Sequence, residues 1–309
     1  MAVVQILIFP GFLFLFALAL ALQFIDRKVY ARLQNRQGPP WFQPLADFIK
    51  LLGKESIIPD EANRLLFSAL PVIALAAVVT AFLSVPIWGT QALMAFPGDM
   101  IVVLALLTLV PLAIFMAGWD SSSMYATIGS QRILTQLFAY EVPLLMSIMG
   151  PALLTGSWSL SDIAAFYAQH PLFAVLNILG FVVALLSAQG KLERVPFDTP
   201  EAETEIVAGA LTEYGGRLYA IFHLAMDMEL VVLPAIFGAV FLPLYSSIPV
   251  LGFLIFLLKT VAIMLVMTLI RSVTARLRIE QMVNFCWLVL VPLALAQIFI
   301  SLIAKGMIL

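Results

Sequence analysis

Charged residues, cysteine and histidine are all scarce in this sequence. Of its 309 residues, 11% are charged and 63% are hydrophobic, whereas soluble domains average roughly 25% charged and 45–50% apolar residues. The single cysteine, Cys286, can form no internal disulfide and cannot supply the ligands of an iron–sulfur cluster or a structural zinc site. The composition therefore excludes an ordinary soluble domain and predicts a membrane chain that carries no cofactor of its own.

Motifs of catalysis and nucleotide binding are missing as well. The sequence contains no P-loop, dinucleotide-binding fingerprint, nucleophile elbow or metal-ligand cluster. Two histidines, His170 and His223, are too few to indicate imidazole catalysis. The net charge of −2 predicts no attraction to nucleic acid. We therefore expect neither catalytic residues nor metal ligands in this chain, and no nucleic-acid partner.

Long apolar runs are abundant. Eight stretches reach the roughly 20 residues needed to cross a hydrocarbon core, and they lie at 6–25, 66–88, 100–119, 134–155, 170–188, 218–241, 249–271 and 285–304. Because backbone polar groups in lipid must be satisfied within each segment, the runs predict an all-α polytopic bundle, a single integral membrane domain over 1–309. The first run lacks a basic start and a small-residue cleavage site, which predicts a retained helix rather than a signal peptide.

Lysine and arginine occupy alternate connections between the predicted spans. The connections 26–65, 120–133, 189–217 and 271–284 hold fourteen of them, whereas 89–99, 156–169 and 242–248 hold none. By the positive-inside rule the basic connections are cytoplasmic loops. We therefore expect a multi-pass protein of the inner (cytoplasmic) membrane with both termini on the outer side.

The first cytoplasmic connection contains a candidate interfacial helix. Over residues 41–54 apolar side chains recur at helical spacing against charged ones, which predicts an amphipathic helix lying in the membrane interface. The apolar residues are Trp41, Leu45, Phe48, Ile49 and Leu52, and the charged ones are Asp47, Lys50 and Lys54. Such a helix can serve as a surface anchor or can gate access of a ligand, and the pattern leaves both alternatives open.

Acidic residues in or beside the membrane are the best candidates for function. An ionisable group at bilayer depth is costly, so it usually faces a protein interior or a wet cavity. Glu141 lies inside the fourth predicted span. It either takes part in a proton relay or forms a hydrogen bond that fixes a neighbouring helix.

A dense group of acids lies in the third cytoplasmic connection. Glu201 and Glu205 would share one face of a helix that begins near Pro200, and Glu213 would continue that face. Together with Glu203 they are crowded enough to raise carboxylate pKa values, so some could hold and release protons near neutral pH. The alternative is a solvated acidic loop.

The sixth and seventh spans carry further ionisable residues. His223 and Asp227 are one helical turn apart with Glu229 close by, and Lys259 lies near the middle of the seventh span. At that depth Lys259 needs an acidic partner, and Asp227 or Glu229 is the nearest candidate in helix order. The pair would be a proton-handling site or a static ion pair that fixes helix packing. With Glu141 and the acidic loop, these residues form a candidate ion path.

Four blocks of sequence together form a specific pattern. The first is Asp26-Arg27-Lys28 with Ala31-Arg32-Leu33-Gln34-Asn35-Arg36-Gln37-Gly38-Pro39-Pro40 and Gln43-Pro44-Leu45-Ala46-Asp47-Phe48-Ile49-Lys50-Leu51. The second is Ala117-Gly118-Trp119 with Tyr140-Glu141-Val142-Pro143. The third is Arg194-Val195-Pro196-Phe197-Asp198 with Pro200-Glu201-Ala202-Glu203, Glu205 and Glu213-Tyr214, and the fourth is Arg271, Arg276, Arg278 and Glu280-Gln281-Met282. Their order resembles the heel subunit of respiratory complex I, the NADH:quinone oxidoreductase, and its homologues in membrane-bound group 4 nickel–iron hydrogenases.

The resemblance implies an eight-helix subunit that docks a peripheral redox module against antiporter-like membrane subunits and couples electron transfer to H⁺ or Na⁺ translocation. It implies a coupling path through Glu141, Glu201, Glu203, Glu205 and Glu213, and we expect the buried groups His223, Asp227, Glu229 and Lys259 to extend that path. Docking of the redox module, or the lining of a cavity beneath it, would fall to charged residues of the blocks and their surroundings: Arg27, Arg32, Arg36, Asp47, Lys50, Arg194, Asp198, Arg276 and Arg278.

The connection after Gly38 indicates which branch of the family is most similar. Quinone-reducing members have a longer, glycine-containing connection before the Gln43-Pro44 pair, and the short form here looks like the hydrogenase side. The resemblance therefore implies a membrane-bound hydrogenase or a related ferredoxin-driven complex. Its partners would be hydrogenase-like large and small subunits and a ferredoxin-like iron–sulfur subunit, which would hold the iron–sulfur clusters and any nickel–iron centre, with ferredoxin as the electron donor.

Two other functions remain as alternatives. The chain could form part of a quinone chamber in an NADH or ferredoxin:quinone oxidoreductase, although the acid that the sixth helix of those members carries falls on Met226, next to Asp227. It could also be a stand-alone secondary transporter, against which the absence of an inverted repeat counts.

Overall fold

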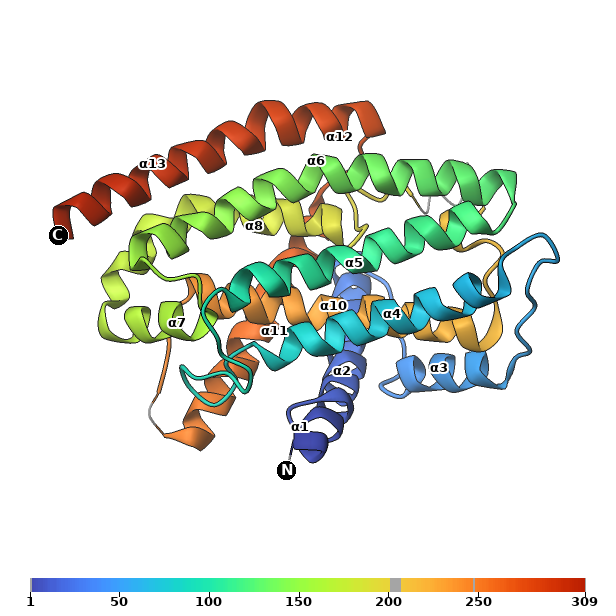
Figure 1. Ribbon diagram of the computed structural model, residues 1–309, viewed down its shortest axis with the longest axis horizontal. Coiled ribbons are helices and arrows are strands. Elements are labelled where there is room, and N and C mark those ends of the chain that lie inside the picture. Colours follow the sequence, from blue (N-terminus) through green and yellow to red (C-terminus); the bar gives the residue numbers. More distant parts are fainter. Residues whose placement is uncertain (1, 201–206, 247, 309) are drawn as a thin grey trace.

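The computed structural model describes residues 2–200, 207–246 and 248–308, and every regular element within these ranges is helical (Figure 1). Eight helical segments are long and apolar enough to cross a membrane. The predicted all-α bundle with eight spans is therefore confirmed.

The spans follow the predicted order. The first is formed by α1 (Ala2–Leu7) and α2 (Phe12–Leu33), and the next three are α4 (Arg64–Leu83), α5 (Asp99–Asp120) and α6 (Met124–Thr155). The last four are η1 (Pro171–Asn177) with α8 (Ile178–Lys191), α10 (Gly216–Phe241), α11 (Pro249–Val273), and α12 (Ile279–Phe285), which continues through η3 (Cys286–Leu290), a π-helical turn, into α13 (Val291–Ile308). Two short helices lie in connections, α3 (Gln43–Gly53) and α7 (Leu160–Gln169), and η2 (Gly209–Leu211) precedes α10.

Two spans extend beyond their apolar runs. Helix α6 begins at Met124 rather than near position 134. In its first turns hydroxyl groups bond back to the helix backbone, as in the 2.7 Å bond from Ser130 to the Ala126 carbonyl. Helix α2 continues past position 25 to Leu33. Hydropathy marks only the apolar part of a helix, and these polar extensions carry Asp26 and Arg132.

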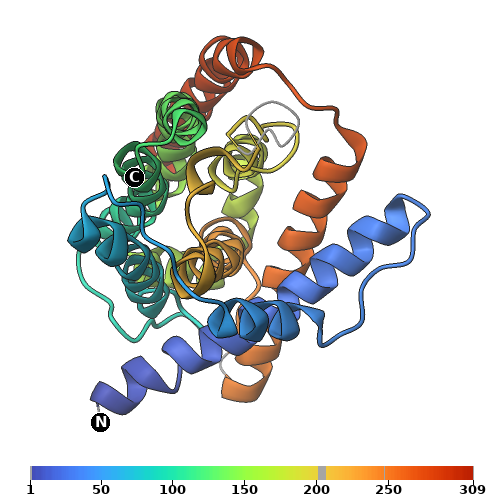
Figure 2. The same cartoon turned by 90° about the vertical axis from the view of Figure 1, so that its right-hand side faces the viewer.

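Helix α10 lies at the centre of the bundle and is the most buried of the eight spans described. Helices α4, α5 and α6 are seen nearly end-on in Figure 2, whereas α2 and α11 are seen from the side, so these two helices are steeply inclined to the rest. The start of α4, the end of α5, the start of α6 and the start of α10 lie together at one end of the molecule, on the right in Figure 1. The basic connections that lead into α4, α6 and α10 thus reach the same end of the molecule.

The predicted amphipathic segment 41–54 contains α3, which begins with Pro44 in its first turn. Its apolar residues Leu45, Ile49 and Leu52 are exposed, while Asp47 accepts hydrogen bonds from Arg27 and Gln43. The helix therefore turns an apolar side outward and ties its polar side to α2.

Glycines allow the segment before α10 to pack tightly on α5 and α6. A Cβ atom added at Gly129 would lie 2.5 Å from the backbone nitrogen of Ala210. In the same region Tyr214 stacks on Phe67 and donates a 3.1 Å hydrogen bond to the Phe67 carbonyl. Burial raises the pKa of Tyr214 well above its usual value, so its hydroxyl remains a donor at all physiological pH values. These contacts fix the residues that lead into the central helix.

Candidate functional site

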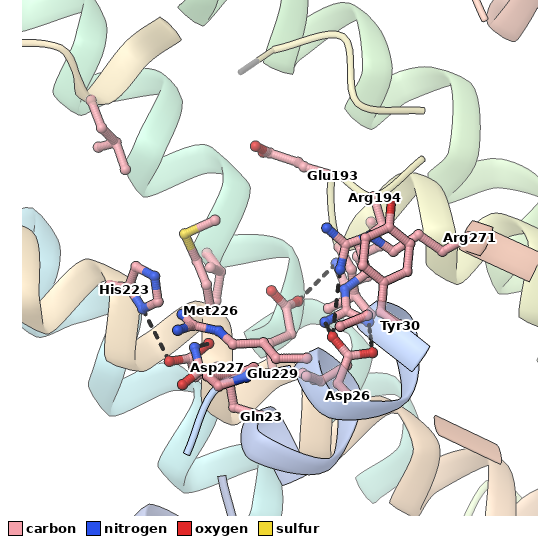
Figure 3. Close-up of a pocket in the computed structure, with 18 of the residues that line it drawn as sticks. Gln23, Asp26, Tyr30, Glu193, Arg194, His223, Met226, Asp227, Glu229 and Arg271 are labelled. Atoms are coloured by element: carbon pink, nitrogen blue, oxygen red, sulfur yellow. Dashed lines mark hydrogen bonds and ion pairs between the residues drawn. The ribbon is translucent and has the colours of Figure 1, made fainter. Parts of the chain in front are cut away.

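A cavity of about 540 Å³ lies among α2, α5, α10, the end of α8 and the end of α11. It is lined by nine charged side chains: Asp26, Arg27, Arg36, Lys191, Glu193, Arg194, Asp227, Glu229 and Arg271. Arg36, Glu193 and Arg194 belong to predicted cytoplasmic connections, so the cavity reaches that end of the bundle. Figure 3 shows Asp26, Arg194 and Arg271 together on one side of the pocket and His223 with Asp227 on the other, with the carboxylate of Glu229 between them.

The first cluster is centred on the carboxylate of Asp26, which is 1% exposed. Arg194 binds it with two parallel hydrogen bonds of 3.1 and 2.8 Å, and Thr268 donates a 2.5 Å bond to the same group. Arg271 approaches at 3.5 Å, and its guanidinium lies over the ring of Tyr30. A buried carboxylate is stable only when it is paired and hydrogen-bonded. The partners of Asp26 meet this need, and their contacts join α2 to the segment after α8 and to α11.

The second cluster is formed by Gln23, His223 and Asp227. Asp227 accepts a 2.6 Å hydrogen bond from the Gln23 amide, and its other oxygen lies 3.0 Å from Nδ1 of His223. A side pocket of about 260 Å³ lies between this cluster and α3, and both cavities are lined by Gln23, Arg27, Tyr219, His223 and Asp227. The cluster therefore forms a wall between the charged cavity and the side pocket beneath the amphipathic helix.

The third group is buried more deeply. The ammonium of Lys191 lies 3.7 Å from a carboxylate oxygen of Glu141 and 3.7 Å from one of Glu229. The side chains of Lys191, Glu229 and Glu141 are 1%, 3% and 15% exposed. We call these three residues the acid–lysine–acid node. Because α6, α8 and α10 each contribute one member, the node connects the central helix to the outer helices of the bundle.

Glu141 also faces the opposite side of α6. Its second oxygen accepts a 2.6 Å hydrogen bond from Thr108 on α5. Glu141 and Thr108 are the polar residues of an otherwise apolar groove of about 500 Å³ between α5 and α6, whose walls include Leu104, Leu145 and Trp158. One carboxylate thus contacts the buried node on one side and borders the open groove on the other.

The structure brings together only part of the predicted path. Glu141 and Glu229 meet at Lys191, and His223 pairs with Asp227 in the cavity wall. Glu213 is exposed and lines neither pocket described above. Glu201, Glu203 and Glu205 lie outside the described residues.

The predicted pairing of Lys259 with Asp227 or Glu229 is wrong. Lys259 instead donates hydrogen bonds of 2.8 and 3.4 Å to the carbonyls of Gly238 and Leu242, and its ammonium lies 4.0 Å from the centre of the Tyr245 ring. Gly238 is nine residues beyond Glu229, which is about 13 Å along a helix. The free carbonyls at the end of α10 and the negative end of its dipole stabilise the buried cation in place of a carboxylate.

Residues predicted to dock a redox module fall into two sets. Arg27, Arg36 and Arg194 line the charged cavity, and Asp47 and Lys50 line the side pocket. Arg32, in the last turn of α2, and Arg276 and Arg278, between α11 and α12, are exposed, and Asp198 is partly buried four residues after Arg194. Of the residues predicted to dock a redox module, some therefore line the two cavities and others lie on the surface.

Sequence reasoning missed Lys191 as a site residue, because it directly follows an apolar run and counted among the basic loop residues. The sequence did contain a signal for a second buried cation. Glu141 and Glu229 both lie in spans and both need a cation, and Lys259 can pair with only one of them. Asp26 and Arg271 were also missed, since each lies at the very end of an apolar run.

Fold and site together define a class, that of a multi-pass membrane subunit whose inclined helices enclose a charged cavity and a buried group of two acids and a lysine. The family model described as NADH dehydrogenase matches residues 4–302, and the chain belongs to this family. The resemblance carried by the four sequence blocks is therefore confirmed.

Individual relatives agree with the family. The chain is 37% identical over 307 residues to the H subunit of NADH-quinone oxidoreductase from Dehalococcoides mccartyi, covering 96% of this chain and 86% of that protein. It is 36% identical over 292 residues to the corresponding protein of the same name from Anoxybacillus flavithermus, covering 91% and 87%. Among solved structures it resembles a chain of the membrane-bound sulfane sulfur reductase, an archaeal respiratory membrane complex, with a TM-score of 0.84 and 27% identity over 94% of this chain and 96% of that one. The protein is a membrane subunit of a complex I-like respiratory assembly.

Proposed function

We propose that this subunit docks a peripheral redox module and couples its electron transfer to the movement of H⁺ or Na⁺ across the membrane. The single observation that carries the proposal is the position of Lys191 between two buried carboxylates that belong to different helices. A chain that served only as a scaffold would have no need for three ionisable groups at this depth, where each is costly.

The node can pass on a change of charge. In an environment with little water, the ammonium of Lys191 interacts strongly with both carboxylates. Protonation of Glu229 weakens its attraction for Lys191 and leaves the cation to Glu141, so a charge change on the cavity side alters the affinity of Glu141 for a proton. Two sites linked in this way share a coupling free energy, and each responds to the other.

The cavity is the input side of this proposal. It opens among residues of the predicted cytoplasmic connections, and Glu229 lies on its wall. A redox module seated over Arg36, Arg194 and the exposed Arg276 and Arg278 would place its electron-transfer centre above the cavity. A change in the charge of that centre would then reach Glu229 without passing through the exposed Glu213.

The groove between α5 and α6 is the output side. A helix of an antiporter-like membrane subunit lying in this groove would cover the apolar walls and would contact Glu141, the ionisable residue among the described residues that line it. A proton released by Glu141 could then pass to a polar group of that partner.

We infer that the partners are of the hydrogenase or ferredoxin-driven type, with iron–sulfur clusters and a nickel–iron or related centre in those subunits. The short connection between Gly38 and Gln43 supports this branch, as does the likeness to the archaeal sulfane sulfur reductase complex. Turnover of the intact complex with reduced ferredoxin, compared with turnover with NADH, tests the inference. Turnover with NADH alone would contradict it.

Variants of the node test the coupling role. We expect Glu141→Gln and Glu229→Gln, in the intact complex, to retain much of the electron transfer and to lower the number of ions moved per electron at least several-fold. The exposed carboxylate variant Asp162→Asn is the control, with unchanged coupling expected, because that residue lies in the first turn of α7 and lines none of the cavities described above. Normal coupling in both node variants would refute the proposed function.

Variants of Lys191 show whether coupling depends on the positive charge of this side chain or on its shape. Lys191→Met keeps much of the side-chain volume and removes the cation, so one of the facing carboxylates must take up a proton and the two acids no longer communicate through a shared charge. We expect coupling to be lost in Lys191→Met and to be largely retained in Lys191→Arg, with ions per electron as the measurement. Equal coupling in the two variants would show that the charge of residue 191 is not used.

A quinone chamber is the second candidate function. Its support is the side pocket of about 260 Å³ that adjoins the charged cavity beneath α3, and the relatives whose names include NADH-quinone oxidoreductase. Together the two cavities are of the size that small-molecule sites have. Quinone bound to the purified complex, or turnover with a short-chain quinone, would favour this function over the first.

A further inference from the structure

The fifth span is divided into two parts of different helical form. Its first part is η1 (Pro171–Asn177), a 3₁₀ helix of seven residues, and its second part is α8, which begins at Ile178 and ends at Lys191. Runs of 3₁₀ helix longer than about three or four residues are uncommon, and within a longer helix they often mark a hinge. Backbone groups that such a junction frees within a membrane need other partners.

The carboxamide of Gln297, on α13, supplies partners at this junction. Its oxygen accepts a 3.1 Å hydrogen bond from the backbone N–H of Gly180, and its nitrogen donates a 3.0 Å bond to the carbonyl of Leu176. In a continuous α-helix these two backbone groups, four residues apart, would bond to each other. The side chain of Gln297 is therefore inserted between them, in the manner of an additional peptide group.

Further buried contacts hold this carboxamide in place. Its nitrogen donates a second bond, of 2.8 Å, to Oδ1 of Asn177, which also accepts a 3.2 Å bond from the hydroxyl of Ser301. Asn177 in turn donates a 2.5 Å bond to the hydroxyl of Tyr167 on α7. All four side chains are 0% exposed. A buried polar network whose members are all bonded specifies one arrangement of the helices that carry them.

Two glycines leave the space that Gln297 occupies. A Cβ atom added at Gly150, on α6, would lie 3.1 Å from Cγ of Gln297, and one added at Gly180 would lie 3.0 Å from the same atom. Helix α13 therefore approaches α6 and α8 closely here because neither helix has a side chain at the point of contact.

A second form of the span follows from helix geometry. If η1 became α-helical, the N–H of Gly180 would bond directly to the carbonyl of Leu176, and the carboxamide of Gln297 would be displaced. A 3₁₀ helix rises about 2.0 Å per residue and an α-helix 1.5 Å, so seven residues would shorten by about 3.5 Å. Because α7 ends at Gln169, the chain fixes the start of η1, and α8 with Lys191 at its end would take up the shift.

We propose that Gln297 is a positioning residue for the acid–lysine–acid node. Its two bonds to the backbone hold the fifth span in its divided form, and through α8 they keep Lys191 between the two acids. The consequence for coupling rests on the proposed function, whereas the consequence for the backbone of the fifth span does not.

The first test is a density map of the intact complex with Gln297→Met. Methionine is unbranched like glutamine, but it lacks both amide groups. We expect residues 171–180 to become α-helical and α8 to shift by about 3.5 Å along its axis. A backbone that keeps its divided form in this variant would overturn the inference.

Gly180→Ala provides a second route to the same result, and it decides the question if Gln297→Met does not assemble. The added Cβ would press on Cγ of Gln297 and push the carboxamide out of the junction, while every polar group of the network is still present. We expect the same change of the backbone, and a divided span with Gln297 still bonded to Leu176 would contradict the proposal.

The second test measures the ions moved per electron, with Ser301→Ala as the matched control. This variant removes a hydroxyl from the same network but leaves both backbone bonds of Gln297 in place. Both variants lose buried hydrogen bonds and should lower the melting temperature, so a purely structural role predicts equal coupling in the two. We expect coupling to fall at least several-fold in Gln297→Met and to be normal in Ser301→Ala.

The two proposals fail in different ways. A shifted α8 in Gln297→Met, together with normal coupling in Glu141→Gln and Glu229→Gln, would refute the proposed function and leave the role of Gln297 in the backbone. An unchanged backbone in Gln297→Met, together with lost coupling in the two acid variants, would refute this inference alone.

Discussion

At the scale of single residues, the carboxylate of Asp26 joins helices through an unusually dense set of contacts. It is held by Arg194, Arg271 and Thr268, which come from the segment after α8 and from α11. Both guanidinium groups would be left without their shared anion if that charge were removed. The residue therefore connects three parts of the chain that are distant in sequence.

We expect Asp26→Asn to destabilise the subunit by about 3–5 kcal/mol, the usual cost of removing one partner from a buried ion pair. The measurement is the melting temperature of the purified complex, with Asp162→Asn, an exposed carboxylate, as the control. A melting temperature equal to that of the control would show that the two arginines find other acceptors.

Several of the site residues were recognisable in the sequence and several were not, for a physical reason. Glu141 and Glu229 were noticed because a lone acid within an apolar run is conspicuous. Lys191 and Asp26 were not, since a charge at the end of a run is also what a loop would show. The pairing of Lys259 was assigned by helix order, but the end of α10 offers backbone carbonyls that no sequence pattern reveals.

At the scale of elements, close packing of α5, α6 and the segment before α10 depends on glycine. At Gly129 an added Cβ would lie 2.5 Å from the Ala210 nitrogen and 2.6 Å from the Gly209 carbonyl carbon. Both of these are backbone atoms, which cannot rotate away. The same segment leads directly to Tyr214 and the start of the central helix.

Gly129→Ala should therefore push the 207–215 segment away from α6 and cost about 1–3 kcal/mol, as overpacking usually does. Gly53→Ala is the matched control, because a Cβ at Gly53 would have nothing within 4 Å. Limited proteolysis near residue 212, together with the melting temperature, measures the effect. Equal protection of the two variants would contradict the packing argument.

Most elements could be predicted from the sequence, but their ends could not. Each span needs a run of about 20 apolar residues, so the eight spans were found by hydropathy alone. The polar first turns of α6 and the last turns of α2 continue these helices beyond their apolar runs, and hydropathy registers only the apolar part. The cavity is lined by the polar end of α2 and by residues of the connections, and it was therefore the least predictable part.

At the scale of the whole molecule, the basic connections that lead into α4, α6 and α10 reach the same end of the bundle (Figure 1). From the positive-inside rule we expect the basic connections to be cytoplasmic and both termini to lie on the outer side. Arg276 is exposed in the basic connection 271–284, and Gln91 is exposed in the connection 89–99, which has no lysine or arginine.

Single-cysteine labelling measures this orientation. The chain has one natural cysteine, Cys286, which is buried, so Cys286→Ala provides a background without reactive thiols. We expect Gln91→Cys in that background to react with a membrane-impermeant thiol reagent in intact cells, and Arg276→Cys to react only after the membrane is opened. The reverse labelling pattern would show that the chain has the opposite orientation in the membrane.

Glu141 contacts the buried Lys191 and also lines the groove between α5 and α6, and this position has a consequence for assembly of the complex in the cell. If a neighbouring helix fills the groove between α5 and α6, as proposed above, this carboxylate borders acyl chains before the complex assembles, where even a partly exposed charge is costly. A newly inserted copy that has not yet met its neighbour is therefore less stable than the mature one. Quality-control proteases should recognise such orphan copies, so the amount of this subunit in the membrane should follow the supply of its neighbour.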